Sequence, residues 1–435
     1  MEDHDPIVIA GGEGCILETV GGEHLIDAVS SLWCNVHGHR CAEIDAAVIE
    51  QLGRVAHVTT LGMAADVTEQ LARRLADCTP PGLEHVFFGS DGASAVEAAM
   101  KMAFQYWRQT SDAARRVSLD STARTKFLAL GRAYHGDTTG ATSLGGIDHF
   151  HRLFRAMLFE PIRGPVPCTY RLPKGVTSDQ ALEFYATQYE GLIADHAGNL
   201  AAVVMEPLVQ GAAGMITHPV GLLRRIREAC DRHDVLLIVD EVATGVGRTG
   251  RLFACEHELV SPDILCLGKG LTGGYLPLSA AVASPRVFEA FGGQATEGRQ
   301  FFHGHTFAGN PLAAAAAIAS LDKLDRENLV AQVDERAGFL REELRQLDDH
   351  PAVGNIRGRG LMFGIELVRN RQTREPFDGP LQIGRKVCDA IRRRGVWIRP
   401  LGDVILIVPP LVVDRPTLTT IAESVVESIE EVLPR

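Results

Sequence analysis

We predict an α/β protein from this sequence, with a mainly parallel sheet in a large domain and a smaller α+β domain. Three observations support the prediction. The chain has 435 residues, more than one small domain needs. Short apolar runs alternate with amphipathic helices through its middle part, and such runs are typical of parallel strands covered on both faces. From about Asp325 the pattern changes to a helix, short strands and a helix.

The elements of the large domain are predicted from these apolar runs and from the helical periodicity between them. The expected strands are 86–88, 126–130, 202–205, 235–239 and 264–267, and the expected helices are 93–107 and 221–232. The first residues form a hairpin-like pattern, which we expect to pack with the C-terminal part. We therefore divide the chain into an N-terminal part of the small domain (1–42), a large domain (43–324) and a C-terminal small domain (325–435).

The composition is acidic and otherwise ordinary for a globular protein. The net charge of −12 argues against nucleic-acid binding, and the longest uncharged apolar stretch, 312–321, is too short to span a membrane. Met1–Asp5 are acidic, and no apolar stretch of a signal peptide follows them. Nine cysteines are scattered without a CxxC pair, which favours reduced thiols. We therefore expect a cytoplasmic protein that binds neither nucleic acid nor membrane.

Two glycine-rich segments raise the question of nucleotide binding. Residues 245–250 match GxGxxG, but in a dinucleotide site the glycines directly follow a strand and open a helix. Here other residues, Asp240 among them, separate the strand from the glycines. A nicotinamide-dependent oxidoreductase is therefore only an alternative, and it predicts tight NAD binding. The P-loop pattern of ATPases is absent, since Gly270 rather than Ser or Thr follows Lys269.

Asp240 and Lys269 together indicate a different cofactor. An acid at the end of a buried strand, such as Asp240, is suited to keep the pyridine nitrogen of pyridoxal phosphate protonated, so that the ring accepts electrons. The cofactor's aldehyde also needs a lysine amine, with which it forms a Schiff base. Lys269 follows an apolar strand and is flanked by glycines that let a cofactor approach the backbone. Most lysines are solvated surface charges, but this setting favours a catalytic role.

The same residues, with their neighbours, resemble the class III (omega) aminotransferases over nearly the whole chain. Residues 240–250 and 267–269 carry the resemblance. It implies a pyridoxal phosphate enzyme of fold type I, with a seven-stranded sheet in its large domain. Gly92 and Ala93 resemble the family's phosphate cup, in which backbone N–H groups hold the phosphate. Asp91 departs from the usual Ser, so its carboxylate has to point away from the phosphate.

The resemblance assigns further residues to the site. It implies that the Tyr134 ring stacks on one face of the cofactor and that Val242 covers the other face. Tyr134 is thereby expected to act in catalysis, in cofactor binding and in substrate binding. Residues 303–311 resemble a segment that crosses to a neighbouring subunit. There, Thr306 would bind the partner's phosphate and Gly304 would line the substrate site. The resemblance therefore implies an obligate homodimer with shared active sites.

Within the class, the chain resembles the enzymes that aminate 8-amino-7-oxononanoate in biotin biosynthesis, in segments 30–39, 98–107, 252–257 and 396–400. This implies that Trp33 binds substrate and that Arg399 holds its carboxylate by two parallel hydrogen bonds. Arg248 is also implied near the substrate, with a structural ion pair as an equal alternative. Leu32 replaces a usual Trp, which leaves the amino donor open between S-adenosylmethionine, the usual one, and lysine.

Other interpretations are weighed beside this one. Another omega-aminotransferase, acting on ornithine, 4-aminobutyrate or diaminobutyrate, shares every cofactor motif. A non-catalytic member of the fold is disfavoured because Asp240 and Lys269 are both present. The His-Gly-His groups at 37–39 and 303–305 have no third acidic or cysteine ligand nearby, so we predict no metal site.

Overall fold

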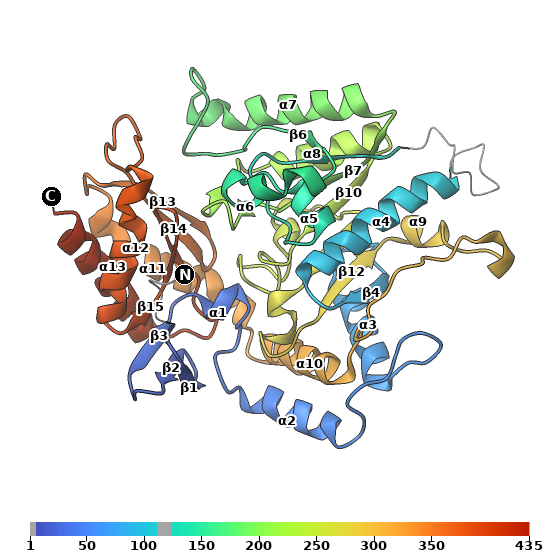
Figure 1. Cartoon of the computed structure of the whole chain (residues 1–435), viewed down its shortest axis with the longest axis horizontal. Coiled ribbons are helices and arrows are strands. Elements are labelled where there is room, and N and C mark those ends of the chain that lie inside the picture. Colours follow the sequence, from blue (N-terminus) through green and yellow to red (C-terminus); the bar gives the residue numbers. More distant parts are fainter. Residues whose placement is uncertain (1–5, 111–123, 435) are drawn as a thin grey trace.

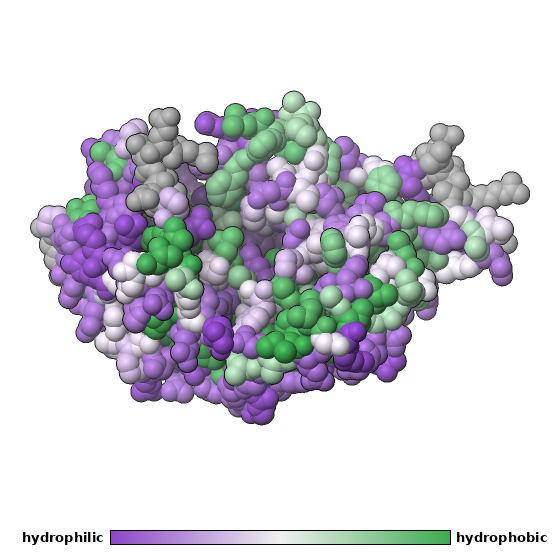
Figure 2. All heavy atoms as spheres, turned by 60° about the horizontal axis from the view of Figure 1, so that its bottom comes forward, coloured by the Kyte–Doolittle hydropathy of each residue, from purple (hydrophilic) through white to green (hydrophobic). Residues whose placement is uncertain are grey.

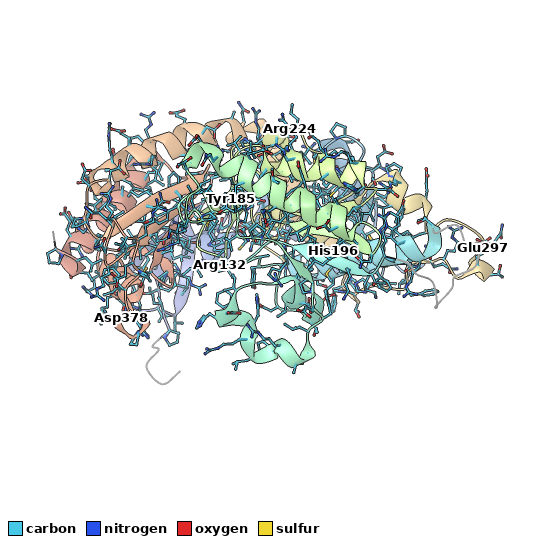
Figure 3. All side chains as sticks on the ribbon, turned by 90° about the horizontal axis from the view of Figure 1, so that it is seen from above. Arg132, Tyr185, His196, Arg224, Glu297 and Asp378 are labelled. Carbon is cyan, nitrogen blue, oxygen red and sulfur yellow. The ribbon has the colours of Figure 1, made fainter. Side chains whose placement is uncertain are left out.

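The computed structural model describes residues 6–110 and 124–434 (Figure 1). Met1–Asp5, on which part of the expected cytoplasmic location depends, lie outside the described residues. Figure 1 shows a large domain on the right and a smaller group of strands and helices on the left. Glu297 and Asp378 lie toward opposite ends of the molecule (Figure 3). Within the described ranges, no helix is long and apolar enough to cross a membrane.

A seven-stranded sheet forms the centre of the large domain, as predicted. Its strand order is β4-β12-β11-β10-β7-β5-β6, and only β12 runs antiparallel to its neighbours. The predicted strands are all present, with small shifts at their ends, and β6 and β12 are added. The strands are β4 His85–Gly89, β5 Lys126–Ala129, β6 Ile162–Arg163, β7 Leu200–Met205, β10 Leu236–Asp240, β11 Ile264–Leu267 and β12 Ser279–Ala283.

Both faces of this sheet are covered by helices. One face packs against α4 (Gly92–Thr110), where Ile238 and Ile264 belong to one apolar cluster. On the other face, Leu237 lies in the main apolar cluster with residues of α8 (Leu222–Arg232). Successive residues of a strand point to opposite faces, so strands covered on both sides need unbroken apolar runs. The two predicted helices of the large domain are confirmed as α4 and α8.

The remaining elements of the large domain and of the segment before it flank these layers. The helices are α1 Ser30–Trp33, α2 Ala42–Leu52, α3 Asp66–Cys78, α5 Thr139–Leu144, α6 Asp148–His151, α7 Ala181–His196, α9 Pro285–Glu289 and α10 Pro311–Arg326. A small hairpin joins β8 Val209–Gln210 to β9 Ile216–Thr217. The 3-10 helices are η1 Arg152–Met157, η2 Ser178–Gln180, η3 Ala254–Glu258, η4 Lys269–Thr272 and η5 Ala295–Glu297.

The C-terminal part forms the smaller α+β unit. Its antiparallel sheet consists of β13 Val353–Arg359, β14 Met362–Leu367, β17 Val404–Ile407 and β16 Arg399–Leu401. Its helices are α11 Leu329–Glu343, η6 Leu344–Leu347, η7 Gly379–Leu381, α12 Ile383–Arg393 and α13 Arg415–Val432. The N-terminal strands β1 Ile9–Glu13, β2 Ile16–Thr19 and β3 His24–Asp27 join it, because β3 pairs with β15 Val396–Trp397. The predicted domain boundaries stay predictions, and α10 runs across the second of them.

The topology of the large sheet fixes where chemistry can occur. Strands β4, β7, β10 and β11 all run in the same direction, because β12 is antiparallel to both β11 and β4. Their carboxyl ends therefore meet at one edge, where open α/β sheets bind their ligands. Glu206 follows β7, Asp240 ends β10 and Lys269 follows β11. The start of α4 follows β4 at the same edge.

Candidate active site

A cavity of about 1110 Å³ opens at this edge of the sheet and reaches the small domain. Most of the residues predicted for the site line it: Trp33, Gly92, Ala93, Tyr134, Asp240, Val242, Lys269 and Arg399. Among the described residues, three of the predicted ones lie elsewhere: Arg248, Gly304 and Thr306. The cavity thus combines side chains from the N-terminal segment, the large domain and the C-terminal part.

Asp240 is held in place by a buried histidine. Its Oδ2 lies 2.7 Å from Nδ1 of His135, and its Oδ1 accepts a hydrogen bond from the Val242 N–H at 3.0 Å. Both side chains are buried, so this contact fixes the carboxylate where water does not compete for it. His135 lines the cavity but was not among the predicted site residues. The only sequence signal for it is its position beside Tyr134.

Lys269 extends from the end of β11 into the cavity. Its backbone has a φ of 42°, an unusual conformation for a lysine, at the start of η4. Its Nζ lies 4.8 Å from the centre of the Trp33 ring. Enclosure by protein lowers the pKa of the amine, while the carboxylates of Asp240 and Glu206 act in the opposite direction. A lowered pKa leaves more of the amine uncharged and nucleophilic.

Glu206 is a second buried acid that the sequence analysis missed. It lines the cavity and accepts hydrogen bonds from the N–H groups of Tyr134 at 3.3 Å and Gly211 at 3.0 Å. Burial raises its pKa to about 7, and the nearby charge of Asp240 acts in the same direction. A signal was present, since Glu206 follows a buried strand just as Asp240 ends one.

The predicted phosphate cup lies at the first turn of α4. Helix geometry leaves the N–H groups of Gly92 and Ala93 without partners inside the helix, which suits an anion. Asp91 caps the helix, since its Oδ1 accepts a hydrogen bond from the Ser94 N–H at 2.9 Å. The departure from the usual Ser is therefore accommodated by a carboxylate that binds the helix itself. A methyl group on Gly92 would lie 2.4 Å from Val242 Cγ1, so this approach requires glycine.

Tyr134 and Val242 both line the cavity near Asp240. The Tyr134 hydroxyl donates a hydrogen bond to Asp137 Oδ2 at 2.9 Å, and burial raises the pKa of the phenol. The backbone N–H of Tyr134 is held by Glu206. The ring is thus fixed at both ends, as an aromatic side chain that flanks a planar ligand needs to be.

The mouth of the cavity is formed by α1 and β16. Ser30, Ser31 and Trp33 have φ values of 50°, 60° and 64°, which place the backbone in a strained conformation. Leu32, the residue that departs from the family's Trp, is 51% exposed and lines the cavity. The exposed Arg399 also lines it and forms no ion pair with any residue in the described ranges.

Arg248 has a structural environment rather than a place in the cavity. Its side chain is 2% exposed, and its guanidinium donates hydrogen bonds to the carbonyl oxygens of Pro409 and Asn35. Burial lowers the pKa of Arg248 to about 10. The predicted substrate contact stays a prediction, and the alternative, a structural ion pair, is not formed with any described residue. The Arg248 guanidinium is held by these backbone carbonyls and by the Ser30 hydroxyl rather than by a carboxylate.

The glycine-rich segment 245–250 forms turns and no helix after β10. Added methyl groups would lie 3.0 Å from Leu411 at Gly247 and 2.4 Å from Asp334 at Gly250, so the segment packs against the C-terminal part. No strand-to-helix turn for a dinucleotide exists here. The nicotinamide alternative therefore lacks the geometry it needs.

Gly304 and Thr306 lie on the surface, outside the cavity. Their predicted roles in a partner's site stay predictions.

In the His-Gly-His groups, His37 binds Ser320 and His39 lies 3.0 Å from Asp27. Within residues 6–110 and 124–434, no group of three metal-binding side chains occurs.

The residues of the cavity fit pyridoxal phosphate. His135 Nε2 is buried and has no hydrogen-bond partner within the described ranges, and Lys269 Nζ lies over the Trp33 ring; both residues line the cavity. A carboxylate, Asp240, is held beside them for a ring nitrogen, and the first turn of α4 offers N–H groups to a phosphate. The cavity therefore offers an amine to the cofactor's aldehyde, a carboxylate to its ring nitrogen and N–H groups to its phosphate.

Comparisons with known proteins agree with this fit. The pattern of the family described as Aminotransferase class-III matches residues 1–430. The chain is 44% identical over 432 residues to the adenosylmethionine-8-amino-7-oxononanoate aminotransferase of Geobacter sulfurreducens, covering 99% of this chain and 93% of that protein. It is 47% identical over 423 residues to the protein of the same name from Nitratidesulfovibrio vulgaris, covering 95% and 77%.

Solved structures give the same result for the fold. The adenosylmethionine-8-amino-7-oxononanoate aminotransferase of Methanocaldococcus jannaschii superimposes with a TM-score of 0.91 at 39% identity, covering 99% of this chain and 94% of that one. An (S)-enantioselective omega-transaminase from Thermomicrobium roseum also has a TM-score of 0.91, at 35% identity and with coverage of 99% and 93%. This chain therefore belongs to the class III aminotransferases, which are pyridoxal phosphate enzymes of fold type I.

Proposed function

We propose that this aminotransferase converts 8-amino-7-oxononanoate to 7,8-diaminononanoate in biotin biosynthesis, with S-adenosylmethionine as the amino donor. One observation carries the proposal: a single cavity joins Lys269 and Asp240 to Arg399, whose guanidinium has no ion-pair partner among the described residues. Relatives named for this reaction at 44% and 47% identity support it. The alternative is the same reaction with lysine as the donor, because Leu32 changes the mouth where the donor enters.

The inner part of the cavity would hold the cofactor. When bound, pyridoxal phosphate supplies an aldehyde that links to amines and a ring that accepts electrons from the donor's carbon. Gly92 and Ala93 would hold its phosphate through their N–H groups. Asp240, fixed by His135, would keep the ring nitrogen protonated. Tyr134 and Val242 would flank the ring.

Lys269 would act as the catalytic base. Because its pKa is lowered, a larger fraction of the amine is free to take a proton from the donor's α-carbon and to return it. Glu206, whose pKa is raised to about 7, is largely protonated in weakly acidic solution and then adds no second negative charge beside Asp240. The charge of Asp240 is therefore available to the cofactor.

Arg399 would orient the acceptor. A guanidinium can hold a carboxylate by two parallel hydrogen bonds, and that of Arg399 has no ion-pair partner in the described ranges to displace first. The Trp33 ring beside Lys269 offers an apolar wall to the aliphatic chain of the acceptor. The carboxylate at one end and the ketone near Lys269 then fix the direction of binding.

The reaction itself tests the proposal. Purified holoenzyme is incubated with 8-amino-7-oxononanoate and either S-adenosylmethionine or lysine, and 7,8-diaminononanoate is measured by mass spectrometry. We expect product with S-adenosylmethionine. Product with lysine alone would establish the alternative donor. Amination of other ketones with ornithine or 4-aminobutyrate, and none of this acceptor with either donor, would refute the substrate assignment.

We infer that the enzyme is a homodimer with shared active sites. Figure 2, which turns the lower part of Figure 1 toward the viewer, shows large apolar patches on this face. Leu61 and Phe302 are 82% and 77% exposed, and Phe307 is also exposed. Thr306 and Gly304 lie in the same segment, so a second copy covering these side chains would bring both residues to a partner's site. Light scattering of wild type and of Phe302→Asp tests this: a fully active monomer would contradict it.

We also propose a cytoplasmic location. The nine cysteines are free, and burial raises the pKa of several of them, Cys230 to about 12, which keeps these thiols protonated and unreactive. Such thiols suit a reducing compartment. Cell fractionation with an antibody against the protein checks the location.

A further inference from the structure

A second cavity lies between the two domains, away from the catalytic one. It measures about 950 Å³ and shares no lining residue with the first. Its walls come from the large domain, near α7 and β9, and from the small domain, near α11 and β13. Leu182 and Phe363 contribute apolar surface on opposite sides of the domain boundary. A ligand bound here would therefore contact both domains.

The charged side chains that line this second cavity are all positive. Four arginines line it, Arg341, Arg357, Arg359 and Arg374, and no Asp or Glu from the described ranges does. The chain as a whole has a net charge of −12, so such a cluster runs against its overall balance. Cationic groups gathered in a concave, partly desolvated space create a strongly positive local potential.

Only part of this positive charge is neutralised by the protein. Arg341 pairs with Asp348 at 2.8 Å, and Arg357 pairs with Glu366 at 2.5 Å. Glu366 is shared with Arg171, which approaches it to 2.6 Å.

The other two lining arginines, Arg359 and Arg374, have no carboxylate partner in the described part of the chain. The Arg374 guanidinium donates a hydrogen bond to the Tyr170 carbonyl oxygen and lies 4.8 Å from the centre of the Tyr170 ring, and the Arg359 side chain forms no hydrogen bond or ion pair within the described ranges. Two of the lining guanidinium groups thus lack a counter-charge from residues 6–110 and 124–434.

A buried histidine in the wall also lacks partners. His218 is 6% exposed and lines the cavity, yet neither of its ring nitrogens has a hydrogen-bond partner among the residues that the structure describes. Burial lowers the pKa of His218 to about 3, so the ring is neutral and offers one donor and one acceptor. Buried polar groups are normally satisfied, and an unsatisfied one calls for a ligand or a water molecule.

We propose that this arginine-lined cavity is a binding site for a small organic anion with several negative charges and an apolar body, such as an organic phosphate. Arg359 and Arg374 supply uncompensated guanidinium groups for the anionic end. Leu182 and Phe363 supply apolar contact for the remainder, and His218 supplies a neutral hydrogen-bonding group. The proposal is independent of the transamination chemistry, since the site lies outside the catalytic cavity.

The site also contacts the wall of the catalytic cavity. Arg357 donates hydrogen bonds to the carbonyl oxygens of Gly214 and Met215, in the connection between β8 and β9. The same connection contains Ala212, which lines the catalytic cavity. An anion that binds beside Arg357 would therefore restrain the connection that carries Ala212 in the wall of the catalytic cavity, and would stabilise the contact between the domains.

Isothermal titration calorimetry of the holoenzyme tests the proposal with two probes at matched ionic strength. Magnesium-free ATP carries both charge and an apolar ring, whereas inorganic pyrophosphate carries charge alone. We expect saturable binding of ATP, and we expect Arg359→Gln to weaken it by about tenfold, the loss of one charge-assisted contact. The Arg359 side chain has no hydrogen-bond or ion-pair partner to lose among the described residues, so the variant should fold normally, which the absorbance of the bound cofactor checks.

A matched variant separates the two cavities. Arg399→Gln changes the arginine of the catalytic cavity, and we expect it to leave ATP binding unchanged. Weakening by Arg399→Gln instead of Arg359→Gln would place the probe in the catalytic cavity and overturn the proposal. Absence of saturable binding of both probes would overturn it as well. Pyrophosphate that binds as tightly as ATP would refute the organic part.

Discussion

At the inner end of the catalytic cavity the acidic side chains are fixed by hydrogen bonds, whereas at its mouth the charged side chain of Arg399 forms no ion pair with a described residue. Asp240 is fixed by His135 at 2.7 Å, and Glu206 accepts two backbone hydrogen bonds. At the mouth, Arg399 has no ion-pair partner in the described ranges and Leu32 is 51% exposed. The inner end is therefore preorganised for one ligand, and the mouth is free to adapt to two substrates in turn.

The largest effect expected at the inner end is that of Lys269→Ala. We expect transamination to fall by about 10⁴-fold or more, because the base and the covalent anchor are both lost. The absorbance band of the lysine-linked cofactor should disappear as well. Lys126→Ala, at the exposed start of β5, is the matched control and should retain both. Full turnover by Lys269→Ala would remove this residue from the mechanism.

Arg399→Ala probes the mouth and should leave the inner end intact. We expect the KM of the acceptor to rise by about 30- to 1000-fold, equivalent to roughly 2–4 kcal/mol for a desolvated charge pair. The spectrum of the bound cofactor should not change. Steady-state kinetics with Arg371→Ala as the exposed control measure the effect. An unchanged acceptor KM would show that the substrate carboxylate binds elsewhere.

Glu206→Gln tests whether the carboxyl of Glu206, at the inner end of the cavity, has a raised pKa in the folded protein. The native carboxyl has a pKa of about 7 rather than its ordinary 4.5, so the folded state binds more protons than the unfolded state between these values. Stability therefore falls as pH rises through this window, by up to about 3 kcal/mol from this group.

The measurement is the free energy of unfolding in urea across this pH range, for wild type and for Glu206→Gln. The variant cannot ionise, so its profile should be flatter. Glu241, whose pKa burial also raises to about 7, keeps some slope in both proteins. Identical slopes in the two profiles would argue against the raised pKa of Glu206.

Gly92→Ala perturbs the phosphate cup by steric contact. The added methyl group would lie 2.4 Å from Val242 Cγ1, so we expect cofactor affinity to fall by about 1–3 kcal/mol through overpacking. The double variant with Val242→Ala should recover part of the loss, and the double-mutant cycle measures the coupling. Equal losses in the single and double variants would mean that the contact is not the cause.

The smallest effect is expected from Leu32→Trp at the mouth. An aromatic ring at this exposed position should contact the donor alone. We expect the apparent binding free energy of the donor, measured through its KM, to change by about 0.5–1.5 kcal/mol. Cofactor binding should be unaffected. Competition between S-adenosylmethionine and lysine, in wild type and variant, measures the preference. A change in the cofactor spectrum would indicate that mouth and inner end are not separable.

Local sequence patterns predicted the sheet and the two central residues of the site. Strands β7, β10 and β11 were predicted because unbroken apolar runs of this length are suited to sheets covered on both faces. Asp240 and Lys269 were predicted because each stands at or just after the end of such a run. The position of an acid or an amine relative to a strand is a local property, and parallel strands bring their carboxyl ends together.

Partnerships between distant residues were not predictable in this way. His135 and Asp240 are 105 positions apart, and no local pattern marks them as a pair. Glu206 had the same local signal as Asp240 but lacked an assigned chemistry.

The sequence by itself determined that an acid and an amine, Asp240 and Lys269, lie at the carboxyl edge of one sheet. Only the tertiary structure decided which arginines face a ligand: Arg399 lines the catalytic cavity, Arg359 lines the second one, and Arg248 is buried against backbone carbonyls. The physical reason is that an arginine's role depends on what surrounds its guanidinium. Those surroundings are assembled from segments far apart in the chain.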